Sequence, residues 1–173
     1  AAEPVRIDIP AEHIRLWTPD SPTLYDLTVT AGADTVHSYF ALRTVEIRAD
    51  KHGVQRLCLN GEPVFLNGVL DQGYFTDGHY LPGDPAEYER DVRRMKALGF
   101  NMLRKHIKRP DPRYYEIADS PGMLVWTDPS SWLTWTPAGA EAGLQLLEDF
   151  IREEGHHPSI VTIHHAAIAA DGR

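Results

Sequence analysis

The hydrophobic pattern of the first 50 residues is typical of β-strands. Alternating or apolar runs at residues 5–9, 25–30 and 36–43 are separated by turn-forming clusters, and residues 45–48 continue the extended character. Three or four strands cannot close a β-sandwich, for which about seven are usual. Either a partner supplies the other strands or upstream sequence is missing, and we favour missing sequence.

From about residue 60 the pattern changes to alternating strand-like and helix-like runs. Asn60 and Gly61 form a strong hairpin signal between residues 55–59 and 62–66, because both tolerate a positive φ. Apolar runs at 65–70, 101–105, 123–127 and 159–164 then alternate with helical patterns. This β-α-β-α-β-α-β order predicts an α/β fold, with a parallel sheet covered by helices.

Two of the predicted helices have clear start signals. Asp84 is suited to the N-cap, Pro85 to the first turn, and Glu87 to completing a capping box. The third helix begins at 136–137 with Thr-Pro. The apolar positions expected to face the core are Tyr88, Val92 and Met95 in the first helix, and Leu144, Leu147, Phe150 and Ile151 in the third.

Composition excludes several classes of protein. Seventeen basic against 25 acidic residues give a net charge of −8, which argues against nucleic-acid binding. The single Cys58 excludes an internal disulfide. No apolar run reaches the roughly 18 residues that a membrane span needs, and the first residues lack the features of a signal peptide. We therefore expect no membrane partner and a cytoplasmic location.

Polar residues that suit a binding site follow the predicted parallel strands. An open nucleotide-binding sheet should show a glycine fingerprint after its first strand, and residues 69–73 (VLDQG) do not match it. In a closed barrel, the site is built where the strands end. Asp71 follows the first strand, Arg104 and His106 lie at the end of the second, and Asp128 and Trp132 follow the third. Aromatic residues there suit sugar stacking, although core packing is an equally ordinary role for them.

Six ordered segments carry a resemblance to glycoside hydrolase family 2. They are LWTPDSPTLY (16–25), FALRTVEI (40–47), LNGEPVFLNGV (59–69), DVRRMKALGFNMLRKH (91–106), DSPGMLVW (119–126) and HPSIV (157–161). The resemblance implies that residues 1–48 are the last strands of an immunoglobulin-like β-sandwich. It implies that residues 49–173 are the first half, about four strands, of a (β/α)₈ TIM barrel.

The same resemblance implies a retaining exo-acting glycosidase of the β-galactosidase, β-glucuronidase and β-mannosidase group, with a carbohydrate substrate and no cofactor. One glutamate would protonate the leaving oxygen and a second would attack the anomeric carbon. By the family pattern, Arg104 would orient a catalytic carboxylate and His106 would contact a sugar hydroxyl. Asp71, Asp128 and Trp132 would line the substrate-binding pocket. The simpler roles are a barrel-end ion pair for Arg104 and packing for His106.

The sequence departs from the family pattern after the fourth strand. Family enzymes follow this strand with Asn-Glu, whose glutamate is the acid/base, but here residues 164–173 read HHAAIAADGR and no glutamate follows Glu154. The nucleophile would lie beyond residue 173. We therefore assign no catalytic residue and expect the chain alone to be inactive. We interpret the change at residue 164 as a frameshift, a misprediction or an artificial end.

The sequence allows two other interpretations. Four histidines (His156, His157, His164 and His165) suggest metal binding, but they lack zincin spacing, and neighbouring residues of a strand point to opposite faces. We therefore predict no metal site. A non-catalytic carbohydrate-binding or scaffold protein remains the alternative function. Half a barrel would also leave open sheet edges, so we expect self-association.

Overall fold

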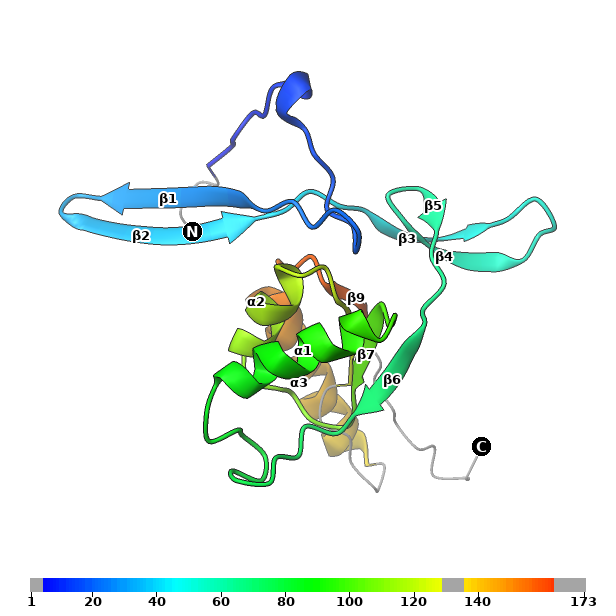
Figure 1. The fold of residues 1–173 in the computed structure, drawn as a ribbon. Helices are drawn as coiled ribbons and strands as arrows, with labels where there is room; N and C mark the ends of the chain where they lie inside the picture. Colours follow the sequence, from blue (N-terminus) through cyan, green and yellow to red (C-terminus); the bar gives the residue numbers. More distant parts are fainter. Residues whose placement is uncertain (1–4, 129–135, 164–173) are drawn as a thin grey trace.

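The structure is a computed structural model that describes residues 5–128 and 136–163. Its strands form a two-stranded hairpin, a three-stranded antiparallel sheet and a four-stranded parallel sheet (Figure 1). The strands are β1 (Tyr25–Ala31), β2 (Asp34–Phe40), β3 (Val45–Ala49), β4 (Gln55–Leu59), β5 (Glu62–Pro63), β6 (Gly68–Asp71), β7 (Met102–Lys105), β8 (Leu124–Thr127) and β9 (Ile160–Ile163). The helices are η1 (Ala11–His13), α1 (Ala86–Ala97), α2 (Arg113–Asp119) and α3 (Pro137–Glu154).

The predicted combination of a parallel β/α sheet with antiparallel strands is confirmed. The parallel sheet has the order β6-β7-β8-β9, so each strand lies beside the next one in the sequence, with one helix in each connection. The 60–61 hairpin is also confirmed: it joins β4 to β5, with φ of 54° at Asn60 and 84° at Gly61. The predicted domain boundary at residue 48 falls within β3, which pairs with β4, and the division into two domains stays a prediction.

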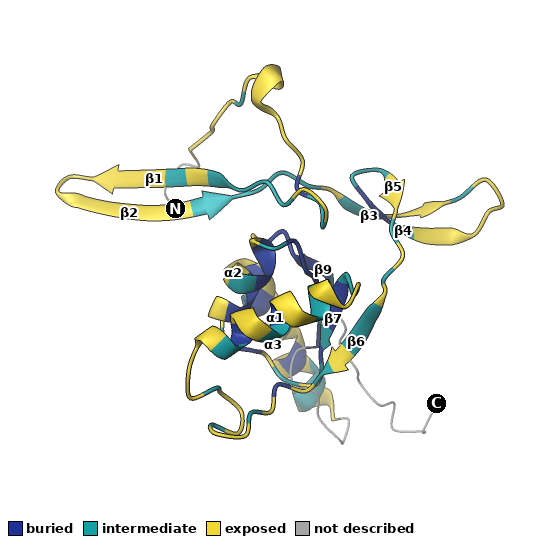
Figure 2. Ribbon diagram, viewed as in Figure 1, coloured by how far each residue is buried: buried dark blue, intermediate teal, exposed yellow. Residues whose placement is uncertain are grey.

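The two faces of the parallel sheet pack against different partners. On one face, Leu103 and Val125 pack with residues of α1, α2 and α3, and we call this the helix-side core. On the opposite face, which we call the inner face, Met102 and Leu124 pack with Trp17 from the segment before β1. Figure 2 shows that burial is concentrated in the sheet and α2, while much of the β1–β2 hairpin is exposed.

A buried carboxylate joins the N-terminal strands to the parallel sheet. Asp119, at the end of α2, is fully buried and accepts hydrogen bonds from the Tyr39 hydroxyl of β2 at 2.7 Å and the Ser159 backbone N–H at 2.9 Å. Nδ1 of His157 lies 2.6 Å from the same carboxylate, and the Trp17 indole N–H donates to the Asp119 carbonyl oxygen at 3.0 Å. We call these five residues the Asp119 cluster. It connects segments more than 100 residues apart in the sequence.

Close backbone contact at Gly122 holds the same junction together. Gly122 has a φ of 76°, and a Cβ atom there would lie 2.4 Å from the carbonyl oxygen of Pro19. Only glycine tolerates both the positive φ and this approach. The glycine after α2 therefore allows the segment before β1 to lie directly against the parallel sheet.

Several sequence predictions are wrong in detail. Residues 5–9 form no strand, and Val5 is almost fully exposed because nothing in the described part of the chain pairs with that segment.

Asp84 does accept a hydrogen bond from the Ala86 backbone N–H, but Glu87 pairs with Arg90 instead of completing a capping box. The first parallel strand starts at Gly68 rather than at residue 65.

The third helix buries less of its apolar surface than its pattern predicts. Thr136 caps α3 as expected, accepting a hydrogen bond from the Gly139 backbone N–H at 3.0 Å. Phe150 is buried in the helix-side core. Leu144 and Ile151, however, are 63% and 51% exposed, because no neighbouring element in the described residues covers that side of α3.

Candidate functional site

The candidate site lies at the carboxyl ends of β6, β7 and β8. Side chains alternate between the two faces of a strand, and the two cores fix which face each residue of β7 occupies. Leu103 belongs to the helix-side core, which places Lys105 on the helix side. Met102 packs on the inner face, which places Arg104 there. Arg104 and Lys105, although adjacent in β7, therefore lie on opposite faces of the sheet.

On the inner face, Arg104 donates two hydrogen bonds to one carboxylate oxygen of Asp128. Its Nε and Nη2 atoms donate to Oδ2 of Asp128 at 3.1 and 2.8 Å. The Asp128 side chain is only 4% exposed, whereas the Arg104 side chain is 33% exposed. The guanidinium carbon also lies 5.2 Å from the centre of the Trp126 ring, within the range of a cation–π contact. We call Arg104, Trp126 and Asp128 the Arg104 cluster.

His106 continues the strand beyond β7. Its backbone N–H donates to the Asp71 carbonyl oxygen at 3.0 Å, so the parallel pairing and the alternation extend to it and assign it to the face of Arg104. Its Nδ1 atom is buried without a hydrogen-bond partner among residues 5–128 and 136–163. A buried ring nitrogen of this kind is suited to a polar ligand, since buried polar groups are normally satisfied.

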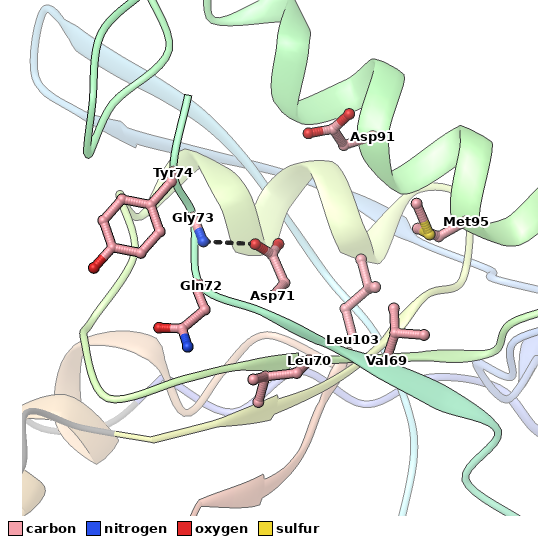
Figure 3. Close-up of a pocket in the computed structure, with 9 residues that line it drawn as sticks. All are labelled: Val69, Leu70, Asp71, Gln72, Gly73, Tyr74, Asp91, Met95 and Leu103. Carbon is pink, nitrogen blue, oxygen red and sulfur yellow. Dashed lines mark hydrogen bonds between the residues drawn. The ribbon is translucent and has the colours of Figure 1, made fainter. Parts of the chain in front are cut away.

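On the helix side, Asp71 pairs with a buried lysine. Nζ of Lys105 donates to Oδ2 of Asp71 at 2.8 Å and lies 4.3 Å from the centre of the Tyr114 ring. Lys105 is only 1% exposed. Oδ1 of Asp71 accepts the Gly73 backbone N–H at 2.7 Å, and Figure 3 shows the carboxylate on the same side of β6 as Asp91 of α1. The ion pair thus fixes the start of the loop that follows β6.

Burial shifts the pKa values of two charged residues on the helix side, Lys105 and Asp91. Burial lowers the pKa of Lys105, and the Asp71 charge opposes that shift. Burial also raises the pKa of Asp91, and the negative charge of Asp71 adds to the effect. The lysine charge therefore carries a desolvation cost that the nearby carboxylates of Asp71 and Asp91 only partly offset.

We predict a pH-dependent stability contribution from Lys105. Because its pKa is lower in the folded chain than the 10.5 of an exposed lysine, the folded state loses this proton first as the pH rises. Between the two pKa values the unfolded state binds more protons, so this contribution to the free energy of unfolding should increase with pH. Urea unfolding of the native chain and of Lys105→Met should be compared across the alkaline range. The free energy of unfolding of the native chain should rise relative to that of the variant, because the pH dependence of the groups that both proteins share cancels in the difference. An equal pH dependence of both proteins would contradict the assignment.

The structure divides the predicted site residues between two places. Arg104, His106 and Asp128 share the inner face, whereas the Asp71 side chain lies on the helix side, so the four side chains do not form one cluster even though all follow the same ends of the strands. Trp132 lies outside the described residues. Sequence reasoning missed Lys105 as a partner of Asp71. Alternation along β7 was the available signal, since it separates Lys105 from both Arg104 and His106.

The described residues contain neither a metal-binding cluster nor a membrane-spanning helix. Within residues 5–128 and 136–163, no group of three or more histidine, cysteine, aspartate or glutamate side chains is arranged to hold a metal ion. In the same residues, no helix combines the length and the apolar character required to cross a membrane. His164 and His165, which entered the metal hypothesis, lie outside the described part.

Comparison with known proteins identifies relatives. No protein-family model matches the chain. A β-galactosidase of Leuconostoc mesenteroides is 25% identical over 167 residues, covering 91% of this chain and 16% of the enzyme. A β-galactosidase of Vibrio vulnificus is 28% identical over 156 residues, covering 84% of this chain and 15% of the enzyme. The chain thus spans about one sixth of the length of these relatives.

Solved structures support the same relationship. The β-glucuronidase of Bacteroides uniformis superposes with a TM-score of 0.74 at 25% identity, over 91% of this chain and 20% of that one. A glycoside hydrolase family 2 β-galacturonidase of Eisenbergiella tayi, bound to galacturonate, gives a TM-score of 0.75 at 22% identity, over 92% and 29%. The chain is homologous to a segment of family 2 glycoside hydrolases. The family resemblance of the six sequence segments is thereby confirmed, for a small part of those enzymes.

Proposed function

We propose that this chain is the sugar-contacting first half of a family 2-type glycosidase barrel, together with the end of the preceding immunoglobulin-like domain. In this proposal residues 1–48 are the last strands of the sandwich, and residues 49–173 begin the (β/α)₈ barrel. The sequential parallel order of β6 to β9, with a helix in each connection, supports a barrel origin. The homology to family 2 enzymes supports the same assignment.

The observation that carries the proposal is the Arg104 cluster. Asp128 accepts two guanidinium N–H groups and thereby fixes the plane of the Arg104 side chain. Because that side chain is still one third exposed, its other N–H groups remain available to a sugar hydroxyl or to a carboxylate supplied from another strand. The Trp126 ring lies within cation–π distance of the guanidinium and helps to hold it in this position.

The relatives indicate the class of sugar. The two relatives named above are β-galactosidases, and the two solved structures named there are a β-glucuronidase and a β-galacturonidase. We therefore propose a β-linked pyranoside as the ligand, with His106 and Arg104 as its polar contacts and Trp132 as a further lining residue. Asp71 fits this scheme as the residue that anchors the loop after β6 through Lys105.

In the proposed parent enzyme, hydrolysis would proceed with retention through two glutamates. This sequence contains no glutamate after Glu154, so neither catalytic group is assigned within it. The chain alone is therefore proposed to bind sugar without cleaving it. The alternative of a non-catalytic carbohydrate-binding or scaffold protein rests on the same missing glutamates. The gene distinguishes the two proposals. If it encodes the remaining barrel strands with their glutamates, the glycosidase proposal holds, and if it does not, the non-catalytic alternative holds.

A sugar titration tests the proposed site. Isothermal titration calorimetry with galactose and with glucuronate should detect binding by the native chain. Arg104→Ala should weaken the binding of the better sugar by about 10- to 150-fold, since it removes charge-assisted hydrogen bonds of roughly 1.5–3 kcal/mol. The matched control is Arg93→Ala, whose side chain is 60% exposed on α1 and pairs with Glu89.

The control variant should bind as the native chain does. Binding that is unaffected by Arg104→Ala, while circular dichroism shows both variants folded, would contradict the proposed site. The absence of binding to either sugar by the folded native chain would contradict the proposed function itself.

A further inference from the structure

The loop between β6 and α1 carries two tyrosines whose rings lie close together. The ring centres of Tyr74 and Tyr80 are 5.3 Å apart, and the rings are tilted by 44°. Between them, Phe75 and His79 form an antiparallel bridge and exchange backbone hydrogen bonds of 2.7 and 3.0 Å. Tyr74 and Tyr80 are the next residues outward from this bridge, so the turn itself brings their side chains together.

Lys108, from the loop between β7 and α2, holds the two tyrosines in place. Its Nζ atom donates to the Gly73 carbonyl oxygen at 2.7 Å and to the Tyr80 carbonyl oxygen at 3.3 Å. The same atom lies 5.3 Å from the centre of the Tyr74 ring and 4.5 Å from the centre of the Tyr80 ring, within the range of cation–π contacts. One ammonium group thus fixes both the backbone and the rings of the loop. We call Tyr74, Tyr80 and Lys108 the tyrosine cluster.

Tyr74 lies on the side of β6 that corresponds to the inner face. Leu70 pairs in register with Arg104, which places both side chains on that face. Figure 3 shows the side chains of Gln72 and Tyr74 on the same side of the chain as Leu70, away from α1. Because Tyr74 lies beyond the end of β6, the tyrosine cluster belongs to the loops that border the Arg104 cluster.

The tyrosine cluster has the surface that a sugar ring needs. Tyr74 and Tyr80 are 64% and 61% exposed in the described structure, although Lys108 lies over both rings. A tyrosine combines a rigid apolar ring with a polar hydroxyl group, and a pyranose combines apolar C–H faces with hydroxyl groups. Rings that are fixed before binding lose less entropy when a ligand is ordered against them. The contacts that fix them lie within residues 70–108 and depend on neither end of the chain.

We propose that the tyrosine cluster is the subsite for the leaving group of a β-glycoside, and that this leaving group is a second pyranose ring. The inference rests on the proposed function, in which the first ring lies against Arg104 and His106. In β/α barrels the loops after the strands surround the ligand, so the rest of a substrate must extend past them. Tyr74 and Tyr80 pack on the second ring, and Lys108 is a positioning residue that keeps them in place.

Two ligands that differ only in the leaving group test the subsite by isothermal titration calorimetry of the full chain. Methyl β-galactoside offers the first ring alone, and lactose adds a β-linked glucose ring. If glucuronate binds better than galactose, methyl β-glucuronide and β-glucuronosyl-(1→4)-glucose replace them. The disaccharide should bind at least about fivefold more tightly than the methyl glycoside, because it adds contacts with two aromatic rings.

Three variants should remove this preference without changing the binding of the methyl glycoside. Tyr74→Ala and Tyr80→Ala should each lower the preference for the disaccharide to about twofold or less. Lys108→Met should have the same effect, since it removes the contacts that hold both rings. The matched control is Phe65→Ala, which removes a ring that is 83% exposed and precedes β6, at the opposite end of the strand. It should keep the native preference.

A saturation-transfer measurement on the native chain tests the same contact without any variant. Irradiation of the aromatic protons of the protein should transfer saturation to the protons of both rings of the disaccharide. Transfer to the first ring alone would overturn the subsite. Circular dichroism verifies that each variant is folded, and the native-chain measurement decides the question if a variant is not.

Failure of the subsite can be distinguished from failure of the proposed function. If the methyl glycoside binds in a manner that depends on Arg104 but the disaccharide binds no better, the subsite is overturned and the proposed function stands. The same holds if Tyr74→Ala and Tyr80→Ala keep the native preference. Equal losses of both affinities in folded Lys108→Met would overturn its positioning role. If the folded native chain binds neither ligand, the subsite and the proposed function are both overturned.

Discussion

The chain of residues 1–173 should release no nitrophenol from nitrophenyl β-galactoside or nitrophenyl β-glucuronide. Retaining hydrolysis needs a carboxylic acid and a carboxylate about 5–5.5 Å apart across the sugar. At the carboxyl ends of the described strands, Asp71 is paired with Lys105 and Asp128 with Arg104, on opposite faces of the sheet. Because enzymes typically accelerate their reactions at least about a millionfold, the difference from an active glycosidase should be unmistakable in a standard absorbance assay.

The positive control for this assay is a family 2 β-galactosidase measured with the same substrates. Release of nitrophenol that purifies together with the chain, and that disappears in Asp128→Asn, would contradict the expected inactivity. It would also show that an aspartate of the Arg104 cluster takes a catalytic role. Release that is unchanged by Asp128→Asn and declines with further purification would come from a contaminating enzyme.

Replacing Asp119 with alanine should lower the free energy of unfolding by about 3–5 kcal/mol, the usual range for breaking a buried charged interaction. The variant would leave the Tyr39 hydroxyl, the His157 ring and the Ser159 N–H without their shared acceptor. Burial and the Asp119 charge raise the pKa of Tyr39, so the tyrosine stays a hydrogen-bond donor at ordinary pH. Urea unfolding monitored by tryptophan fluorescence would measure the change.

Asp149→Ala is the matched control for this variant. Asp149 also interacts with a basic residue and an amide, but on the surface of α3, where its side chain is 38% exposed. Surface ion pairs contribute at most about 1 kcal/mol, so the control should unfold nearly as the native chain does. Equal effects of the two substitutions would mean that the Asp119 cluster does not stabilise the junction between the N-terminal strands and the parallel sheet.

Much of the fold could be predicted because several local signals agreed. The positive-φ residues at 60–61 predicted the β4–β5 hairpin, and the nearly continuous apolar character of residues 123–127 predicted a strand buried on both faces. The Thr136 cap of α3 was also predicted correctly, as was the apolar face of α1 that packs in the helix-side core. These features depend on short-range chemistry that is visible within a few residues of sequence.

Features that depend on distant partners could not be predicted in the same way. Alternation in residues 5–9 indicated a strand, but a strand needs a neighbour, and the described chain offers none. The apolar positions Leu144 and Ile151 indicated a buried face, but no element covers them here. The Asp119 cluster was missed because its members lie far apart in the sequence and carry no shared spacing.

The sequence predicted the location of the candidate site but not the face of the sheet on which each side chain lies. The residues at the ends of the strands were found from the order of strands alone, because parallel strands bring their carboxyl ends to one edge. Which face each side chain occupies depends on the register and on core packing. For that reason Asp71 was grouped with Arg104 and Asp128, although its carboxylate lies with Lys105 on the helix side.

The most direct test of the proposed sugar-contacting face is a nuclear magnetic resonance titration of the isotope-labelled full chain with the sugar that binds better in calorimetry. Chemical-shift changes should concentrate at Arg104, His106, Trp126 and Asp128 and should saturate as the sugar concentration rises. The β1–β2 hairpin should remain unchanged. Shifts confined to the hairpin, or no saturable shifts at the inner face, would contradict the account.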